Sequence, residues 1–132
     1  MTITLQEAEK VLQAARQQAT SMSIKVSIAV VDRRGDLVVL ARMDDAGYFT
    51  PDIARGKAVV SGSFGAPSAA FAERAAMPIF QTLNQMNQNR MVFHQGAVPI
   101  LKGGNVIGAI GVSGATSEQD EEVAKAGAAM IS

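Results

Sequence analysis

The 132-residue chain has no cysteine, no tryptophan and only one histidine. The absence of cysteine excludes disulfide bonds, thiolate metal sites and cysteine nucleophiles. The single imidazole, that of His94, excludes a mononuclear metal site built from two or three histidines of one subunit. Binding or catalytic chemistry must therefore rest on other side chains, or on one histidine.

The chain also lacks an excess of either charge and any long apolar run. Twelve acidic and twelve basic residues give no net charge, so nothing predicts nucleic acid or an anionic membrane as a partner. No segment is long and apolar enough to cross a bilayer, and the start of the chain shows no signal-peptide pattern. We expect a cytoplasmic protein formed by one domain over residues 1–132, which can bury a core without disulfides or metals.

The strands are expected in adjacent pairs. Residues 24–32 and 36–43 are rich in apolar and β-branched side chains on either side of Gly35, and residues 98–101 and 106–113 flank a glycine-containing turn. Each pattern predicts an antiparallel hairpin. Because paired strands favour this arrangement over a doubly wound parallel sheet, we predict an α/β (α+β) protein with an antiparallel sheet packed by helices.

Helices are expected before, between and after the hairpins. Thr4 and Glu7 form a capping-box pattern ahead of an amphipathic stretch. Thr50 and Pro51 open a second helix as N-cap and first helical residue, and Gly62, Gly65 and Pro67 are expected to break it. The remaining helices are predicted at 68–76, from Pro78 through Met86, and from Thr116 or Ser117 to near the end of the chain.

Lys57 occupies an unusual position on the second helix. It shares one face with Ile53, Val60 and Phe64, the apolar stripe that should turn inward. An ammonium buried without a partner is costly, so a lysine held there needs a carboxylate, a bound anion or a water-filled pocket. The alternative is that its methylenes pack on the core while its charged end reaches water.

A glycine-rich segment, residues 108–114, leads directly into the last helix. Its glycine spacing does not match a dinucleotide-binding fingerprint, and it continues a hairpin instead of opening a βαβ unit. Because free N–H groups and the helix dipole favour an anion at a helix N-terminus, Ser113, Gly114 and Thr116 are candidate ligand-binding residues. The alternative is a glycine-rich strand that a helix crosses closely.

Asp120 is the candidate partner of Lys57. On the last helix it falls on the same side as Val123 and Gly127, which are expected to face inward. It could instead cap the helix, because Ser117-x-x-Asp120 resembles a capping box with Asp in place of Glu. If Asp120 and Lys57 share a cavity, they are suited to orient a polar substrate or to exchange a proton.

Three further side chains are candidates on their chemistry alone. His94 could transfer a proton or ligate a metal, with a structural role as the alternative. Tyr48, the sole tyrosine, could hydrogen-bond a ligand or lie half-buried in its loop. Arg42 could bind an anion or pair with Asp44 or Asp45.

Several motifs then occur along nearly the whole chain in a specific order and spacing. They are Ala29-Val30-Val31-Asp32 with Gly35, Arg42-Met43-Asp44, Ile53-Ala54-x-x-Lys57-Ala58, Gly96-x-Val98-Pro99-Ile100, and Gly108-Ala109-Ile110-Gly111-Val112-Ser113-Gly114 followed by Gln119-Asp120. In this set the sequence resembles the GlcG/HbpS-like haem-binding proteins, also met as the C-terminal domain of PduO-type cobalamin adenosyltransferases.

The resemblance implies a profilin-like or PAS-like α/β/α sandwich around an antiparallel sheet of about five strands, and a homo-oligomeric assembly. For some members it implies binding of haem or other tetrapyrroles, while others accompany small-molecule catabolic enzymes. PduO-type domains place a haem-ligating histidine in the first helix, where this chain has Arg16, Gln17 and Gln18. Haem, the expected cofactor, would then take its axial ligand from another residue. The candidates are His94, Tyr48, Met22 and Met43.

Three functions follow from these residues. The first is a small-ligand-binding protein, because an apolar sheet, an inward lysine and a glycine-rich rim suit a mostly apolar ligand that bears carboxylates. The resemblance implies that this is a haem- or tetrapyrrole-binding accessory protein, although a small aromatic acid fits the same description. The alternative is a cofactor-free isomerase, lyase or hydrolase acting on a small oxygenated carboxylic acid, in which Lys57 holds the substrate and Asp120 or His94 moves a proton. A further alternative, a non-catalytic oligomeric sensor module, rests on fold analogy.

Overall fold

A four-stranded antiparallel sheet forms the centre of the structure, a computed structural model that describes all 132 residues. Its strand order is β2-β1-β4-β3, so the two hairpins meet along β1 and β4. The strands are β1 (Ser27–Asp32), β2 (Leu37–Arg42), β3 (Ala97–Lys102) and β4 (Asn105–Ser113). The two predicted hairpins and their antiparallel pairing are confirmed.

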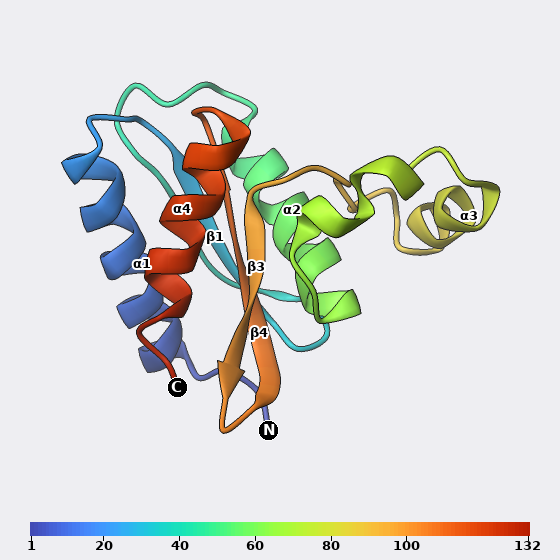
Figure 1. The fold of residues 1–132 in the computed structure, drawn as a ribbon, viewed down its shortest axis with the longest axis horizontal. Helices are drawn as coiled ribbons and strands as arrows, with labels where there is room; N and C mark the ends of the chain where they lie inside the picture. Colours follow the sequence, from blue (N-terminus) through green and yellow to red (C-terminus); the bar gives the residue numbers. More distant parts are fainter.

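Helices cover both faces of this sheet, as Figure 1 shows. α1 (Leu5–Ser21) and α4 (Ser117–Ala128) lie side by side on one face. α2 (Thr50–Phe64) packs on the other face, against β1 and β4. The predicted α/β/α sandwich is therefore confirmed. No helix combines the length and the apolar character needed to cross a membrane.

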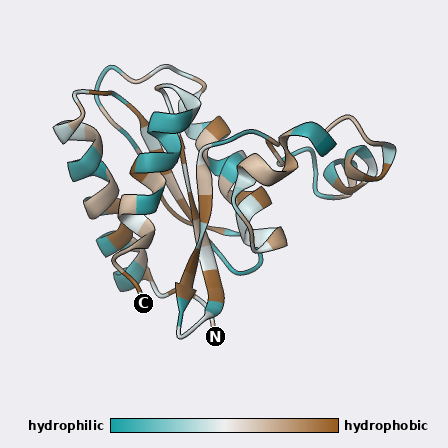
Figure 2. Ribbon diagram, viewed as in Figure 1, coloured by the Kyte–Doolittle hydropathy of each residue, from teal (hydrophilic) through white to brown (hydrophobic).

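The alternation of side chains along the strands creates two separate packing layers. Ile110 and Val112 of β4 belong to the large core beneath α1 and α4, whereas Ala109 packs with residues of α2. Gly111 faces α2 so closely that a Cβ there would collide with the carbonyl oxygen of Ala54. The absence of a side chain at Gly111 thus lets α2 lie directly on β4. Figure 2 shows the apolar strands between helices that carry hydrophilic residues.

The remaining helical segments form an arm that extends away from the sheet (Figure 1). It comprises the 3₁₀ helix η1 (Ser68–Arg74) and α3 (Pro78–Met86), which buries none of its residues. Stacking of Phe71 on Phe64, with ring centroids 4.5 Å apart, attaches the arm to the end of α2. Phe80 of α3 completes this aromatic contact.

Three details of the predicted fold are wrong. The sheet has four strands instead of about five, because only the two hairpins contribute strands. Of the three residues expected to break α2, Gly62 does not do so; the helix continues to Phe64 and ends at Gly65, which has a left-handed conformation. Gly62 is buried where α2 packs on the sheet, and a Cβ there would make ordinary van der Waals contact, 3.4 Å from the carbonyl oxygen of Asp32. The N-cap of α2 is Phe49, one residue before the predicted Thr50.

Candidate functional site

Lys57 is buried beneath α2, where only 3% of its surface is exposed. Its Nζ donates hydrogen bonds to the carbonyl oxygen of Val112, at 3.0 Å, and to Oδ2 of Asp120, at 3.2 Å. Two of its three N–H groups therefore have partners from β4 and α4. An inward lysine was expected either to have a carboxylate, anion or water-filled pocket as its partner or to extend its charged end into water. The structure shows the carboxylate partner, and the ammonium does not reach bulk water.

Asp120 is held as tightly as its partner. Its Oδ1 accepts a hydrogen bond from the backbone N–H of Ala115 at 3.0 Å. It lies in the first turn of α4, where the helix dipole stabilises a negative charge. The predicted capping box of Ser117 and Asp120 is wrong, because Thr116 and Gln119 form it instead. Asp120 is thereby left to bridge Lys57 and the turn that precedes α4.

Gly96 completes the surroundings of the ion pair. Its φ of +138° lies in a region that other residues rarely adopt, and a Cβ there would be 2.7 Å from both Lys57 Nζ and the Val112 carbonyl oxygen. The segment before β3 can therefore pass directly over the ammonium only because residue 96 is glycine. The segment is also tied to β4, because Val112 N–H donates to Gly96 O at 2.9 Å.

A cavity of about 330 Å³ opens beside the ion pair. One part of its wall is apolar and another carries hydroxyl, carboxylate and ammonium groups, with the exposed ring of His94 at its edge. This combination is typical of a small-molecule site. The lining residues are Ile53, Lys57, Val92, His94, Ser113, Ala115, Ser117 and Asp120.

The cavity brings together Lys57, Asp120, His94 and Ser113 of the residues predicted from the sequence. Ser117 and Val92 were not predicted as ligand contacts. Ser117 was considered only as a helix start, and Val92 carried no signal because an isolated valine before a strand resembles any partly buried residue.

Other predicted residues lie elsewhere. Thr116 accepts a hydrogen bond from Gln119 N–H as the N-cap of α4, and Gly114 packs on the backbone of Lys25 and Val26. Tyr48 is 85% exposed, with the Arg42 guanidinium 5.7 Å from its ring centroid. Arg42 lines a different cavity, of about 270 Å³, which also includes Met43. Met22 packs against the core beneath α1 and α4.

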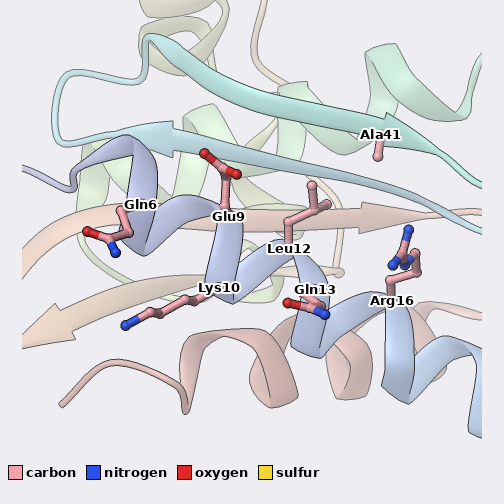
Figure 3. Close-up of a pocket in the computed structure, with 7 residues that line it drawn as sticks. All are labelled: Gln6, Glu9, Lys10, Leu12, Gln13, Arg16 and Ala41. Atoms are coloured by element: carbon pink, nitrogen blue, oxygen red, sulfur yellow. The ribbon is translucent and has the colours of Figure 1, made fainter.

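A larger cavity, of about 390 Å³, lies between α1 and β2 (Figure 3). Leu12 points toward the strand that carries Ala41, whereas Lys10 extends away from the sheet. Arg16, near the helix position where the resemblance places a haem-ligating histidine, lines this cavity. The polar side chains do not converge on one point, and no group of three or more His, Asp or Glu residues is arranged to hold a metal ion. The cavity beside Lys57 is therefore the better candidate site.

Comparisons with known proteins agree with this fold. A family model described as "Haem degrading protein HbpS-like" matches residues 3–129. Protein GlcG of Escherichia coli K12 is 33% identical over 116 residues, which cover 84% of this chain and 81% of GlcG. A double mutant of Streptomyces reticuli HbpS matches with a TM-score of 0.86 at 35% identity, over 100% of this chain and 88% of that one. A complex of PduOC with haem shares the fold, with a TM-score of 0.85 at 24% identity over 99% and 96% of the two chains.

Proposed function

Since this chain belongs to the HbpS-like family, as its sequence motifs predicted, we propose that it binds haem or a related tetrapyrrole. Two comparisons support the proposal. The description of the matching family names a haem-degrading protein, and PduOC, which shares the fold, has been crystallised with haem. The proposal must then be tested against the residues of this chain, because the first helix carries Arg16 and no histidine.

The observation that carries the proposal is the position of His94. The only imidazole of the chain lies at the edge of the cavity beside Lys57, and its ring is exposed. Its Nδ1 lies 3.4 Å from the carbonyl oxygen of Gln95, a long contact that leaves Nε2 open. A neutral imidazole nitrogen is a common axial ligand of haem iron.

The rest of the cavity also fits such a ligand. Ile53, Val92 and Ala115 supply apolar wall, and Ser113 and Ser117 supply hydroxyl groups. At about 330 Å³ the cavity lies at the lower end of the range for small-molecule sites, so it would receive part of a tetrapyrrole while the rest extends outward. Bound haem would supply redox chemistry at its iron, and the chain would supply the axial nitrogen and the apolar contact.

Titration with hemin tests this function. We expect saturable binding of one hemin per subunit with a shifted Soret band, and we expect His94→Ala to lose that shift. Tyr48→Phe is the matched control, because Tyr48 is the other ring-bearing candidate for an axial ligand and lies outside the cavity. Unsaturable adsorption by the wild type, or an unchanged spectrum for His94→Ala, would contradict the proposal.

A second function is favoured by the ion pair itself. Lys57 and Asp120 both line the cavity while remaining almost fully buried, and His94 and Ser113 face the same space. Such a set could hold a small oxygenated carboxylic acid at Lys57 and move a proton through Asp120 or His94. The protein would then be an isomerase, lyase or hydrolase that needs no cofactor.

Proton exchange distinguishes this enzyme from a binding protein. Hemin-free protein would be incubated in D₂O with small hydroxy and keto acids, and the loss of the C–H signals next to the hydroxyl or keto group followed by NMR. An isomerase or lyase of this type should catalyse the exchange for at least one acid, and His94→Gln should slow it without changing the folded fraction. The absence of exchange for every acid argues against an isomerase or lyase and leaves the haem proposal untouched.

We also propose that the protein is a homo-oligomer, as the family resemblance implies. On α3, which buries none of its residues, the large apolar side chains Ile79 and Met86 are more than half exposed. A second subunit that covered α3 would remove this apolar surface from water. Sedimentation velocity measures the mass directly, and a monomer at all concentrations would refute the proposal.

A further inference from the structure

Arg55 carries a buried polar atom that the fold leaves without a partner. Among the buried side-chain nitrogen and oxygen atoms of the protein, Arg55 Nε alone makes no hydrogen bond. An unsatisfied buried donor costs about 1–3 kcal/mol, and natural proteins pair nearly all of them. The unpaired Nε therefore indicates an interaction that the isolated chain does not supply.

The surroundings of Arg55 form a second cavity, of about 250 Å³. It lies between the start of α2 and the segment at 89–92, which crosses the helix where Val92 N–H donates to Gly56 O at 3.2 Å. Ile53 and Val92 belong to the walls of both this cavity and the one beside Lys57. The two cavities are thus adjacent, and a ligand would extend from one to the other over these two side chains.

The charge of this second cavity favours an anion. Arg55 and Arg90 line it, and neither forms a salt bridge. Arg90 donates from Nε and Nη2 to the backbone and side-chain oxygens of Asn87, at 3.2 and 2.9 Å, which fix its guanidinium without neutralising it. Asp52 is the one acidic residue of the lining, and it is exposed. Two cations and one anion leave an excess positive charge.

We propose that Arg55, with Arg90 beside it, binds a carboxylate of the ligand whose apolar body occupies the cavity beside Lys57. A guanidinium matches a carboxylate through two parallel N–H···O bonds. Because Nε is buried in the unliganded chain, the Arg55 side chain must shift toward the cavity before Nε can donate to the carboxylate. Lys57 cannot serve this purpose equally well, because its charge is already neutralised by Asp120 at 3.2 Å. The inference rests on the proposed function in that the ligand class, an apolar molecule with a projecting carboxylate, includes haem with its propionates.

Hemin and its dimethyl ester, in which both carboxylates are capped, form a matched pair of probes. Wild-type protein should bind hemin about tenfold or more tightly than the ester, the loss expected for one charge-assisted hydrogen bond. Arg55→Gln should bind both alike, and Arg55→Lys, which keeps the charge without the fork, should fall between. Arg33→Gln is the control, because Arg33 is exposed in the turn between β1 and β2. An equal preference for hemin in wild type and Arg55→Gln would overturn the inference.

A second pair of probes separates this inference from haem binding. 4-Phenylbutyrate carries a carboxylate on an apolar body, and 4-phenylbutanol is its neutral counterpart. The acid should raise the melting temperature of the wild type and of Arg33→Gln, but not of Arg55→Gln. If hemin fails to bind while this pattern holds, the haem function falls and the carboxylate site stands. If acid and alcohol act alike on the wild type, the carboxylate site falls regardless of hemin.

Discussion

Replacement of Lys57 by methionine tests the central interaction of the candidate site. Methionine keeps most of the length of the side chain and removes the ammonium. Asp120, only 3% exposed, would keep the N–H of Ala115 and lose its cation, and the Val112 carbonyl oxygen would lose a donor. Breaking a buried ion pair by removing one partner costs about 3–5 kcal/mol. That is a large part of the total stability of about 5–15 kcal/mol expected for a domain.

The matching change at Asp120 gives the prediction its specificity. Asp120→Leu alone leaves a buried ammonium whose remaining partner is the Val112 carbonyl oxygen, and should cost a similar amount. The double variant Lys57→Met/Asp120→Leu leaves no buried charge. It should therefore be clearly more stable than the sum of the single changes predicts, because buried ion pairs replaced by apolar pairs are often neutral or better.

Urea unfolding followed by far-UV circular dichroism measures these free energies, since the chain has no tryptophan to report by fluorescence. Lys125→Met is the control. Lys125 lies 3.9 Å from Glu121 on the surface of α4, with 66% of its side chain exposed, so its loss should cost less than about 1 kcal/mol. The reasoning would be refuted if Lys57→Met were as stable as the Lys125→Met control. It would also be refuted if the stability loss of the double variant equalled the sum of the losses of the two single variants.

Three more predictions follow from features outside the ion pair. The Lys102 ammonium, 2.8 Å from Glu7, lowers the pKa of that carboxyl from 4.5 to about 2. A carboxyl whose pKa is lower in the folded chain stabilises the fold at pH values above its unfolded pKa, so the higher melting temperature of the wild type relative to Glu7→Gln should shrink as the pH falls from 4.5 toward 2. A difference in melting temperature that does not depend on pH would contradict this. Gly96→Ala should destabilise by more than about 1 kcal/mol in urea, because φ is positive and the new Cβ meets Lys57 Nζ, and an unchanged midpoint would show that the segment adapts freely. Ile110→Ala, at a fully buried position of β4, should cost about 2–5 kcal/mol in the same assay, whereas a smaller loss would mean that the core collapses into the space.

The sequence predicted the sheet well because its signals are local. Each hairpin has β-rich residues on both sides of a glycine-containing turn, and the two pairings appear as expected. The position of Gly62 was misjudged for a non-local reason. Considered within one helix, a glycine predicts the end of the helix. Here Gly62 is buried against β1, with the carbonyl oxygen of Asp32 close to it, and the helix continues through this contact. Such packing cannot be inferred without knowing which strand lies beneath the helix.

The site was predictable in part, on the same grounds. Helical periodicity placed Lys57 and Asp120 on inward faces, and the structure brings them to 3.2 Å. Arg55 has no comparable signal, because its significance lies in one nitrogen that lacks a partner, which only coordinates reveal. For Tyr48 the sequence predicted too much. A tyrosine side chain is suited to ligand binding, but the loop that carries Tyr48 directs it into solvent.

The order of the strands also has a consequence for the folding rate. β1 pairs with β2 and β3 with β4 across short turns, whereas the central pair of β1 and β4 joins Ser27 to Ser113. Contacts between residues far apart in sequence slow folding, because the intervening loop must close before the contact is formed. The cost of closure grows only with the logarithm of loop length, so shortening the arm of η1 and α3 would accelerate the joining of the two hairpins only slightly.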